Sequence, residues 1–192
     1  MLLLILGLLI FLGAHSTRIV AEPWRRATIA RIGESRWKLA YTAVSLVGLA
    51  LIVWGYGQAR SAPVLLWIAP VWARHLAALL TLAAFVLLAS AYVPGNAIKA
   101  RLHHPMMIGV LIWALAHLMA NGRLAAELLF ASFGLWALLG WRAARGRDAA
   151  EARVYAPGKP GATVAAVVVG VTAWAAFAFW AHGWLIGVRP FG

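Results

Sequence analysis

The side chains with the clearest capacity for chemistry in this sequence are its histidines. They lie within or at the edge of long apolar stretches and are His15, His75, His103, His104, His117 and His182. An ionisable side chain inside a membrane segment is energetically costly and usually has a function. Because neutral imidazole is also a common metal ligand, the histidines indicate either a metal-containing cofactor or hydrogen bonds between helices.

Other reactive side chains are scarce. The chain has no cysteine, which excludes disulfides and thiolate ligands. Its carboxylates do not pair within any apolar stretch, which argues against a hydrolytic carboxylate dyad, a di-iron cage and a proton relay; they are Glu22, Glu34, Glu127, Asp148 and Glu151. Haem suits this set better, since its iron takes axial imidazoles and its propionates pair with arginine. Zinc would need three or four ligands, for which His15, His75 and His117 are candidates.

Helical geometry makes His117 the leading candidate. At about 100° per residue, one helix face carries Met106, Val110, Trp113, Ala114, His117 and Asn121. Small Ala114 is expected to leave room for a flat ring, and Trp113 is expected to stack against that ring. His104 points to nearly the opposite side, about 220° away. The pair His104-Pro105 is typical of a helix start, so His104 is only an alternative ligand.

A second ligand is expected from another helix. His15 lies near one end of the first apolar stretch, and Arg18 follows on the same helix face. Together they offer an iron ligand and a partner for a haem propionate. The alternative is a histidine and an arginine that both reach lipid headgroups. His75, in the third stretch, is the replacement ligand.

The elements that position these residues are predicted to be transmembrane helices. The chain is 64% hydrophobic and 11% charged, against about 25% charged in soluble domains. We therefore expect one all-α membrane domain over residues 1–192, a polytopic bundle of about six helices. Apolar stretches long enough to span a bilayer lie near residues 2–17, 37–57, 66–92, 105–121, 124–141 and 162–186. Pro63 and Pro70 predict a kink or an interfacial segment at the start of the third.

Basic residues predict the orientation. The net charge is +12, and most lysines and arginines fall in the loops after the first, third and fifth stretches. The positive-inside rule puts these loops in the cytoplasm and both termini outside, on the periplasmic side. Contact with anionic lipid explains this charge, so nucleic acid is not an expected partner. The first loop, residues 17–38, is either an amphipathic segment on the bilayer or a solvated connector.

Ordered pieces of the sequence resemble the NnrU family of bacterial membrane proteins. They are HSTR at 15–18, GESRWK at 33–38, HHP at 103–105, WALAH at 113–117 and NG at 121–122. The family is related to the plant-type 15-cis-ζ-carotene isomerase, a membrane enzyme that contains haem b. The resemblance implies a bacterial inner-membrane protein in which His15 and His117 are the axial ligands of haem iron. Ala114 stands where the isomerase pattern has a cysteine.

The resemblance implies two kinds of function and does not decide whether the chain is an enzyme. One is a redox-gated cis-trans isomerase that acts on an apolar, carotenoid-like isoprenoid. The other is a redox protein linked to nitrogen oxides and denitrification, with NO as a partner. From the residues alone, a cofactor-free membrane scaffold with structural histidines is the alternative. A lipid-modifying enzyme using His103 and His104 would need a nucleophile or metal partner that the sequence does not offer.

Overall fold

The computed structural model describes residues 1–191 and is helical almost throughout. Its helices are α1 (Leu2–Val20), α2 (Glu22–Ile32), α3 (Glu34–Ser61), α4 (Val71–Tyr92), α5 (Ala97–Leu102), α6 (Pro105–Ala120), α7 (Leu124–Ala150), α8 (Pro160–Ala176), the π-helix η1 (Phe177–Ala181) and α9 (His182–Ile186). Within these described residues there is no β-strand, only an isolated bridge between Leu65 and Arg123. The fold is the all-α membrane bundle that the sequence predicts.

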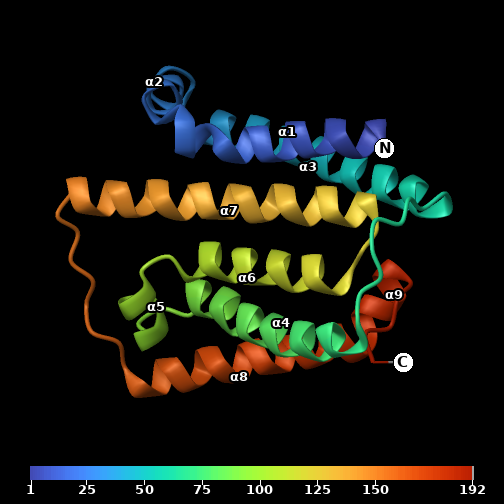
Figure 1. The fold of residues 1–192 in the computed structure, drawn as a ribbon. Coiled ribbons are helices and arrows are strands. Elements are labelled where there is room, and N and C mark those ends of the chain that lie inside the picture. The colour runs from blue at the N-terminus through green and yellow to red at the C-terminus, as the bar shows by residue number, and fades with distance from the viewer. Residues whose placement is uncertain (192) are drawn as a thin grey trace.

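The long helices lie side by side in the order α3, α1, α7, α6, α4, α8 (Figure 1). The short helices α2 and α5 lie at the same end of the long helices along their axes, which we call the α2 end. The N-terminus of α1 and the short helix α9 lie together at the opposite end, the α9 end. Neighbours in the row are therefore often distant in sequence, as α1 and α7 are.

Glycines bring α1 and α3 into close contact. A Cβ atom built on Gly7 would lie 2.6 Å from the backbone nitrogen of Ile52, and one built on Gly48 would lie 2.7 Å from that of Phe11. Small residues at a membrane-helix interface allow such close approach. The pair α1–α3 then packs on α7 through a core that includes Leu4, Leu8 and Ala125.

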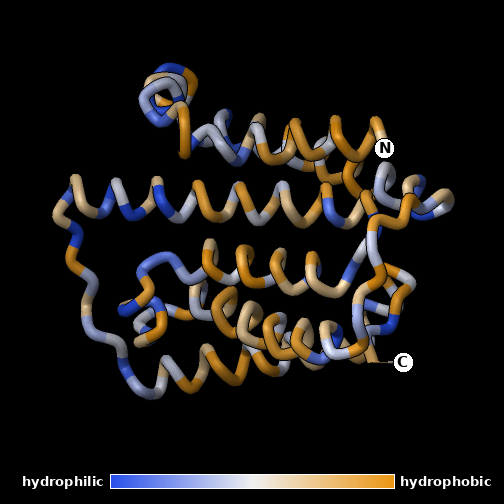
Figure 2. The backbone as a smooth tube through the Cα atoms, in the orientation of Figure 1, coloured by the Kyte–Doolittle hydropathy of each residue, from blue (hydrophilic) through white to orange (hydrophobic). Residues whose placement is uncertain are grey.

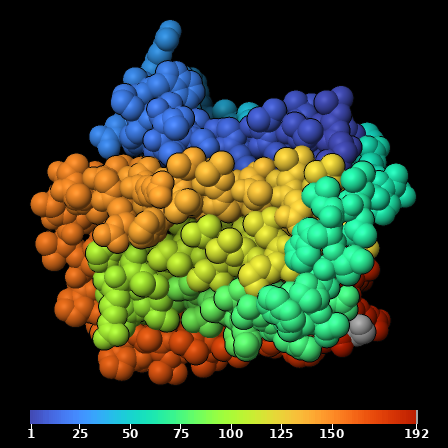
Figure 3. Space-filling view, in the orientation of Figure 1, coloured from blue at the N-terminus to red at the C-terminus, as the bar shows by residue number. Residues whose placement is uncertain are grey.

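Two predicted stretches have different helical bounds in the structure. The third was expected to begin near residue 66, but α4 begins at Val71. Residues 62–70 instead form an extended segment, the strap, whose Leu66 N–H donates to the Gly122 carbonyl at 2.7 Å. Pro63 and Pro70 disfavour helix there, and pairing with the α6–α7 turn satisfies the backbone. Figure 3 shows this segment, in teal, against the yellow start of α7. The helix α7 continues past the fifth apolar stretch to Ala150.

The surface is that of a multi-pass membrane protein in contact with lipid. Five helices have the length and composition to cross a membrane: α1, α3, α4, α7 and the continuous run from α8 through α9. The fourth predicted span corresponds to α6, which is apolar but has only 16 residues, about 24 Å at 1.5 Å per residue. Large apolar side chains such as Leu9 and Trp180 are exposed. Hydrophilic segments lie at both ends of the helices, among them α2 and α5 at the α2 end (Figure 2).

Candidate functional site

Five of the six histidines line two cavities, which lie at opposite ends of the bundle. The first, which we call the His117 pocket, has a volume of about 530 Å³ and is formed by the strap, α4, the end of α6, the end of α8 with η1, and the C-terminal segment. The second, the His15 groove, has a volume of about 800 Å³. It is formed by the end of α1, by α2, by the starts of α3 and α6, by the end of α4, by α5 and by the far part of α7. Both volumes are in the range of ligand sites, roughly 300–1,000 Å³.

The His117 pocket combines aromatic walls with a cationic rim. Its aromatic lining comes from five elements and includes Trp67, Phe85, Trp113, Trp174 and Phe177. Three arginines also line it, namely Arg74, Arg123 and Arg189. An apolar cavity with a few placed polar groups is the usual form of a small-molecule or cofactor site. The arginines add affinity for negatively charged groups on such a ligand.

The imidazole of His117 is held rigidly inside this pocket. Its Nδ1 lies 2.8 Å from the Trp113 carbonyl, one turn earlier, so Nδ1 carries the proton and donates it. The ring stacks on Phe130 with centroids 4.4 Å apart, and Trp113 lies 5.1 Å away at 52°. Within residues 1–191, Nε2 has no hydrogen-bond partner, so its lone pair is free. A donated Nδ1–H and a free Nε2 are the usual arrangement of a metal-binding histidine.

His182 enters the same pocket from the C-terminal segment. Its Nδ1 donates to the Val188 carbonyl at 2.6 Å, and its ring meets Phe177 edge-on at 5.6 Å. It directly follows the π-helix η1, a type of distortion often found at functional sites. His182 is not among the ligands predicted from the sequence. Its position at the same predicted membrane depth as His117 was the signal that could have identified it.

Two further predicted residues have different fates around His117. Asn121 lines the pocket. Ala114 does not line the pocket, because it is fully buried against Ala126 and Phe130 of α7. A Cβ built on Gly134 of α7 would lie 3.3 Å from the Cβ of Ala114. The space expected beside Ala114 is therefore filled by a neighbouring helix, and the cavity opens on another side of His117.

His15 lies in the other cavity, together with Arg18. Its Nδ1 donates to the Phe11 carbonyl at 2.7 Å, and its ring stacks on that of Phe11 at 4.1 Å. Between His15 and His117 stand Phe11, Phe133 and Trp113, with successive centroids 5.8 Å and 5.9 Å apart. The structure thus does not bring His15 and His117 into one cavity.

The remaining histidines have other partners or none nearby. Nε2 of His104 lies 2.7 Å from Oδ2 of Asp148, which also accepts a hydrogen bond from the Tyr155 hydroxyl at 2.8 Å. His103 has a positive φ of 62° and stacks on Tyr155 at 4.0 Å. His75 is exposed on α4 and lines neither cavity. In the described part of the chain, no three histidine or carboxylate side chains gather as a metal-binding cluster, as a zinc site would require.

Comparison with known proteins gives one match. The model of the family described as NnrU protein matches residues 3–190, nearly the whole chain. No curated relative and no solved structure matches.

Proposed function

The chain belongs to the NnrU family, and on that premise we propose that it is a membrane protein that binds haem b in the His117 pocket. The observation that carries the proposal is that His117 and His182 line one aromatic cavity, each with Nδ1 fixed to a backbone carbonyl and Nε2 free. Both nitrogens have the protonation state that iron ligation needs.

The other residues of the pocket fit the same cofactor. Aromatic side chains such as Trp67 and Trp174 suit an apolar macrocycle, while Arg74, Arg123 and Arg189 suit its propionates. When bound, haem b supplies one-electron redox chemistry and an iron whose ligation decides between carrying electrons and binding a small molecule. The aromatic walls limit the access of water to it.

The chain's own residues orient the ligands. The Phe130 ring and the Trp113 carbonyl fix the plane and the tautomer of His117. The strap, held by Gly122, closes one side of the pocket and contributes Trp67. Ligands that are held before binding lose little conformational freedom on binding, which favours affinity.

We propose His182, rather than His15, as the second ligand. The family resemblance favours His15, but in this structure three aromatic side chains stand between it and His117. Two histidines on one iron favour an electron carrier. We therefore propose a redox protein of the bacterial inner membrane linked to nitrogen oxides, in preference to an isomerase of apolar substrates.

The test is the absorption spectrum of the full chain purified from haem-replete cells, oxidised and reduced, with and without NO. We expect a low-spin haem b spectrum in the wild type and loss of haem in His117→Ala and in His182→Ala. His75→Ala is the matched control, because His75 lies at the same end of the bundle but outside the pocket. It should retain full haem.

The outcomes separate the alternatives. A colourless protein, or His117→Ala with full haem, would refute the haem site and favour a scaffold with structural histidines. If His15→Ala loses haem and His182→Ala keeps it, the pairing implied by the resemblance is correct and the pairing proposed here is wrong. Turnover of a carotenoid-like substrate would favour the isomerase.

A further inference from the structure

The His15 groove carries an excess of positive charge that the proposed haem site does not use. Six cationic side chains line it: Arg18, Arg25, Lys38, Lys99, Arg147 and Arg153. The acidic side chains in the lining are Glu34, Asp148 and Glu151. Because the groove lies at one end of the bundle, at the edge of the apolar zone, this charge faces the level of lipid headgroups.

Some of these charges are neutralised inside the protein. Lys38 forms an ion pair with Glu34 at 2.7 Å, and Arg25 with Glu22 at 3.4 Å. Arg153 lies 3.8 Å from Asp148. These cations therefore add little attraction for an external anion.

Three of the lining cations form no ion pair among residues 1–191, and each comes from a different helix. They are Arg18 of α1, Lys99 of α5 and Arg147 of α7. Arg147 of α7 donates from Nη1 to the Arg18 carbonyl at 3.1 Å, which brings it to the end of α1. Lys99 of α5 donates to the Ala91 carbonyl at 2.8 Å. All three line the same groove, and like charges within one groove repel one another. A bound anion would remove that repulsion and link three elements.

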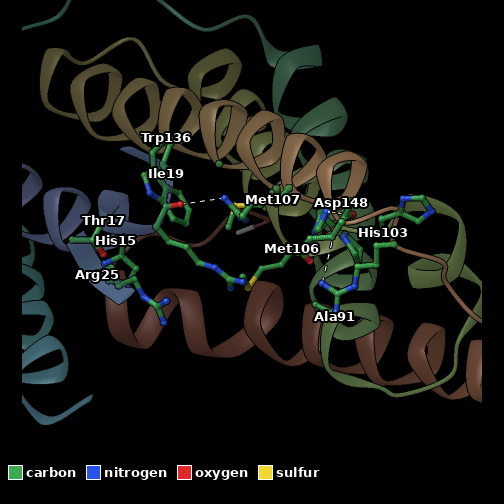
Figure 4. A pocket seen from close by; sticks show the side chains of 18 of the residues that line it. His15, Thr17, Ile19, Arg25, Ala91, His103, Met106, Met107, Trp136 and Asp148 are labelled. Atoms are coloured by element: carbon green, nitrogen blue, oxygen red, sulfur yellow. Dashed lines mark hydrogen bonds and ion pairs between the residues drawn. The ribbon is translucent and has the colours of Figure 1, made fainter. Parts of the chain in front are cut away.

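The same groove has an apolar side. Ile19, Met106, Met107 and Trp136 line it together with the cations. Figure 4 shows Met107, in this view, between His15 and Arg25 on one side and His103 and Asp148 on the other. Methionine side chains are flexible and adapt to chains of irregular shape. An occupant would thus need an anionic group at one end and an apolar chain at the other.

We propose that the His15 groove binds an anionic phospholipid of the surrounding bilayer. Its phosphate pairs with Arg18, Lys99 and Arg147, and one acyl chain lies along Met106 and Met107. The site joins α1, α5 and α7 at the α2 end, so the lipid stabilises the contact between the α1–α3 pair and the rest of the bundle. This proposal is independent of haem in the His117 pocket.

Native mass spectrometry of the purified full chain in detergent tests the proposal, with phosphatidylglycerol and phosphatidylcholine of the same acyl chains. We expect one phosphatidylglycerol to bind more tightly than phosphatidylcholine. Each of Arg18→Gln and Arg147→Gln should weaken it about fivefold, from the attraction of one basic residue near an anionic surface. Arg142→Gln is the matched control, because Arg142 is exposed on α7 and does not line the groove.

The result that supports the proposal is a loss confined to the groove variants, with size-exclusion profiles and thermal midpoints close to wild type. Equal binding of the two lipids would overturn it, as would equal losses in Arg142→Gln and Arg147→Gln. Competition by inorganic phosphate as strong as by the lipid would also overturn it, since the apolar side would then play no part. If Arg147→Gln fails to fold, Arg18→Gln decides alone. The Arg18 side chain makes no hydrogen bond within the described residues, so its replacement removes no internal contact of that kind.

Discussion

Replacing Gly48 by alanine should push α1 away from α3. A Cβ at this position would lie 2.7 Å from the backbone nitrogen of Phe11 and 2.9 Å from its Cα. Contacts this short with backbone atoms cannot be relieved by rotating a side chain, so the helices must separate. Phe11 also accepts the hydrogen bond from His15 and stacks on its ring. The displacement therefore reaches the wall of the His15 groove.

The magnitude follows from a comparison with Gly57→Ala in the same helix. Nothing lies within 4 Å of a Cβ at Gly57, so that variant gains only helix propensity, up to about 1 kcal/mol. Gly48→Ala has the same gain but adds an overpacking cost of about 1–3 kcal/mol. The difference between the two variants isolates the overpacking, because the propensity gain cancels.

Thermal unfolding in one detergent, followed by far-ultraviolet circular dichroism, measures this difference. One kcal/mol corresponds to roughly 2–4 °C in a chain of this size. We therefore expect Gly48→Ala to unfold roughly 2–12 °C below Gly57→Ala. Equal midpoints for the two variants would show that α1 and α3 are not in the close contact described above.

Two further substitutions test local contacts at the two ends of the bundle. A Cβ at Gly122 would overlap the Trp67 carbonyl, so Gly122→Ala should release the strap and speed its cleavage in limited proteolysis; Gly13→Ala, where nothing lies within 4 Å, should not. Burial and the hydrogen bond to Asp148 raise the pKa of Tyr155, so the stability that this hydroxyl adds is complete below about pH 10 and is lost as pH rises through the higher folded-state value. Tyr155→Phe should thus cost about 0.5–1.5 kcal/mol near pH 8, and its gap from wild type in unfolding experiments should narrow above pH ~10; a gap independent of pH would contradict this reasoning.

Hydropathy predicts the helices well, because lipid exposure imposes long apolar stretches wherever a helix crosses. The start of α6 at Pro105 and the end of the α8–α9 run at Ile186 match the predicted spans. The start of α4 does not, because backbone pairing between the strap and Gly122 is a contact between distant segments. No local pattern encodes that contact.

The site was predictable only where one helix determines it. The approach of Trp113 to His117 and the place of Asn121 follow from helical periodicity, and both are present. The prediction of free space beside Ala114 was wrong, because helical periodicity gives the direction of a side chain but not which helix packs against it. That helix is α7, whose neighbours in the row cannot be read from sequence alone.

His117 and His15 make the same local hydrogen bond but differ in the residues that line the cavity around them. Each ring donates Nδ1–H to the carbonyl four residues earlier, which leaves Nε2 as an acceptor. In the His15 groove, lined by charged side chains at the headgroup level, water can donate to Nε2. The His117 pocket instead joins aromatic rings to three arginines, and His182 lines the same cavity with its Nδ1 already bonded to a carbonyl. Two imidazoles that can both offer Nε2 to one ligand therefore lie together at His117, which is why we place the cofactor there.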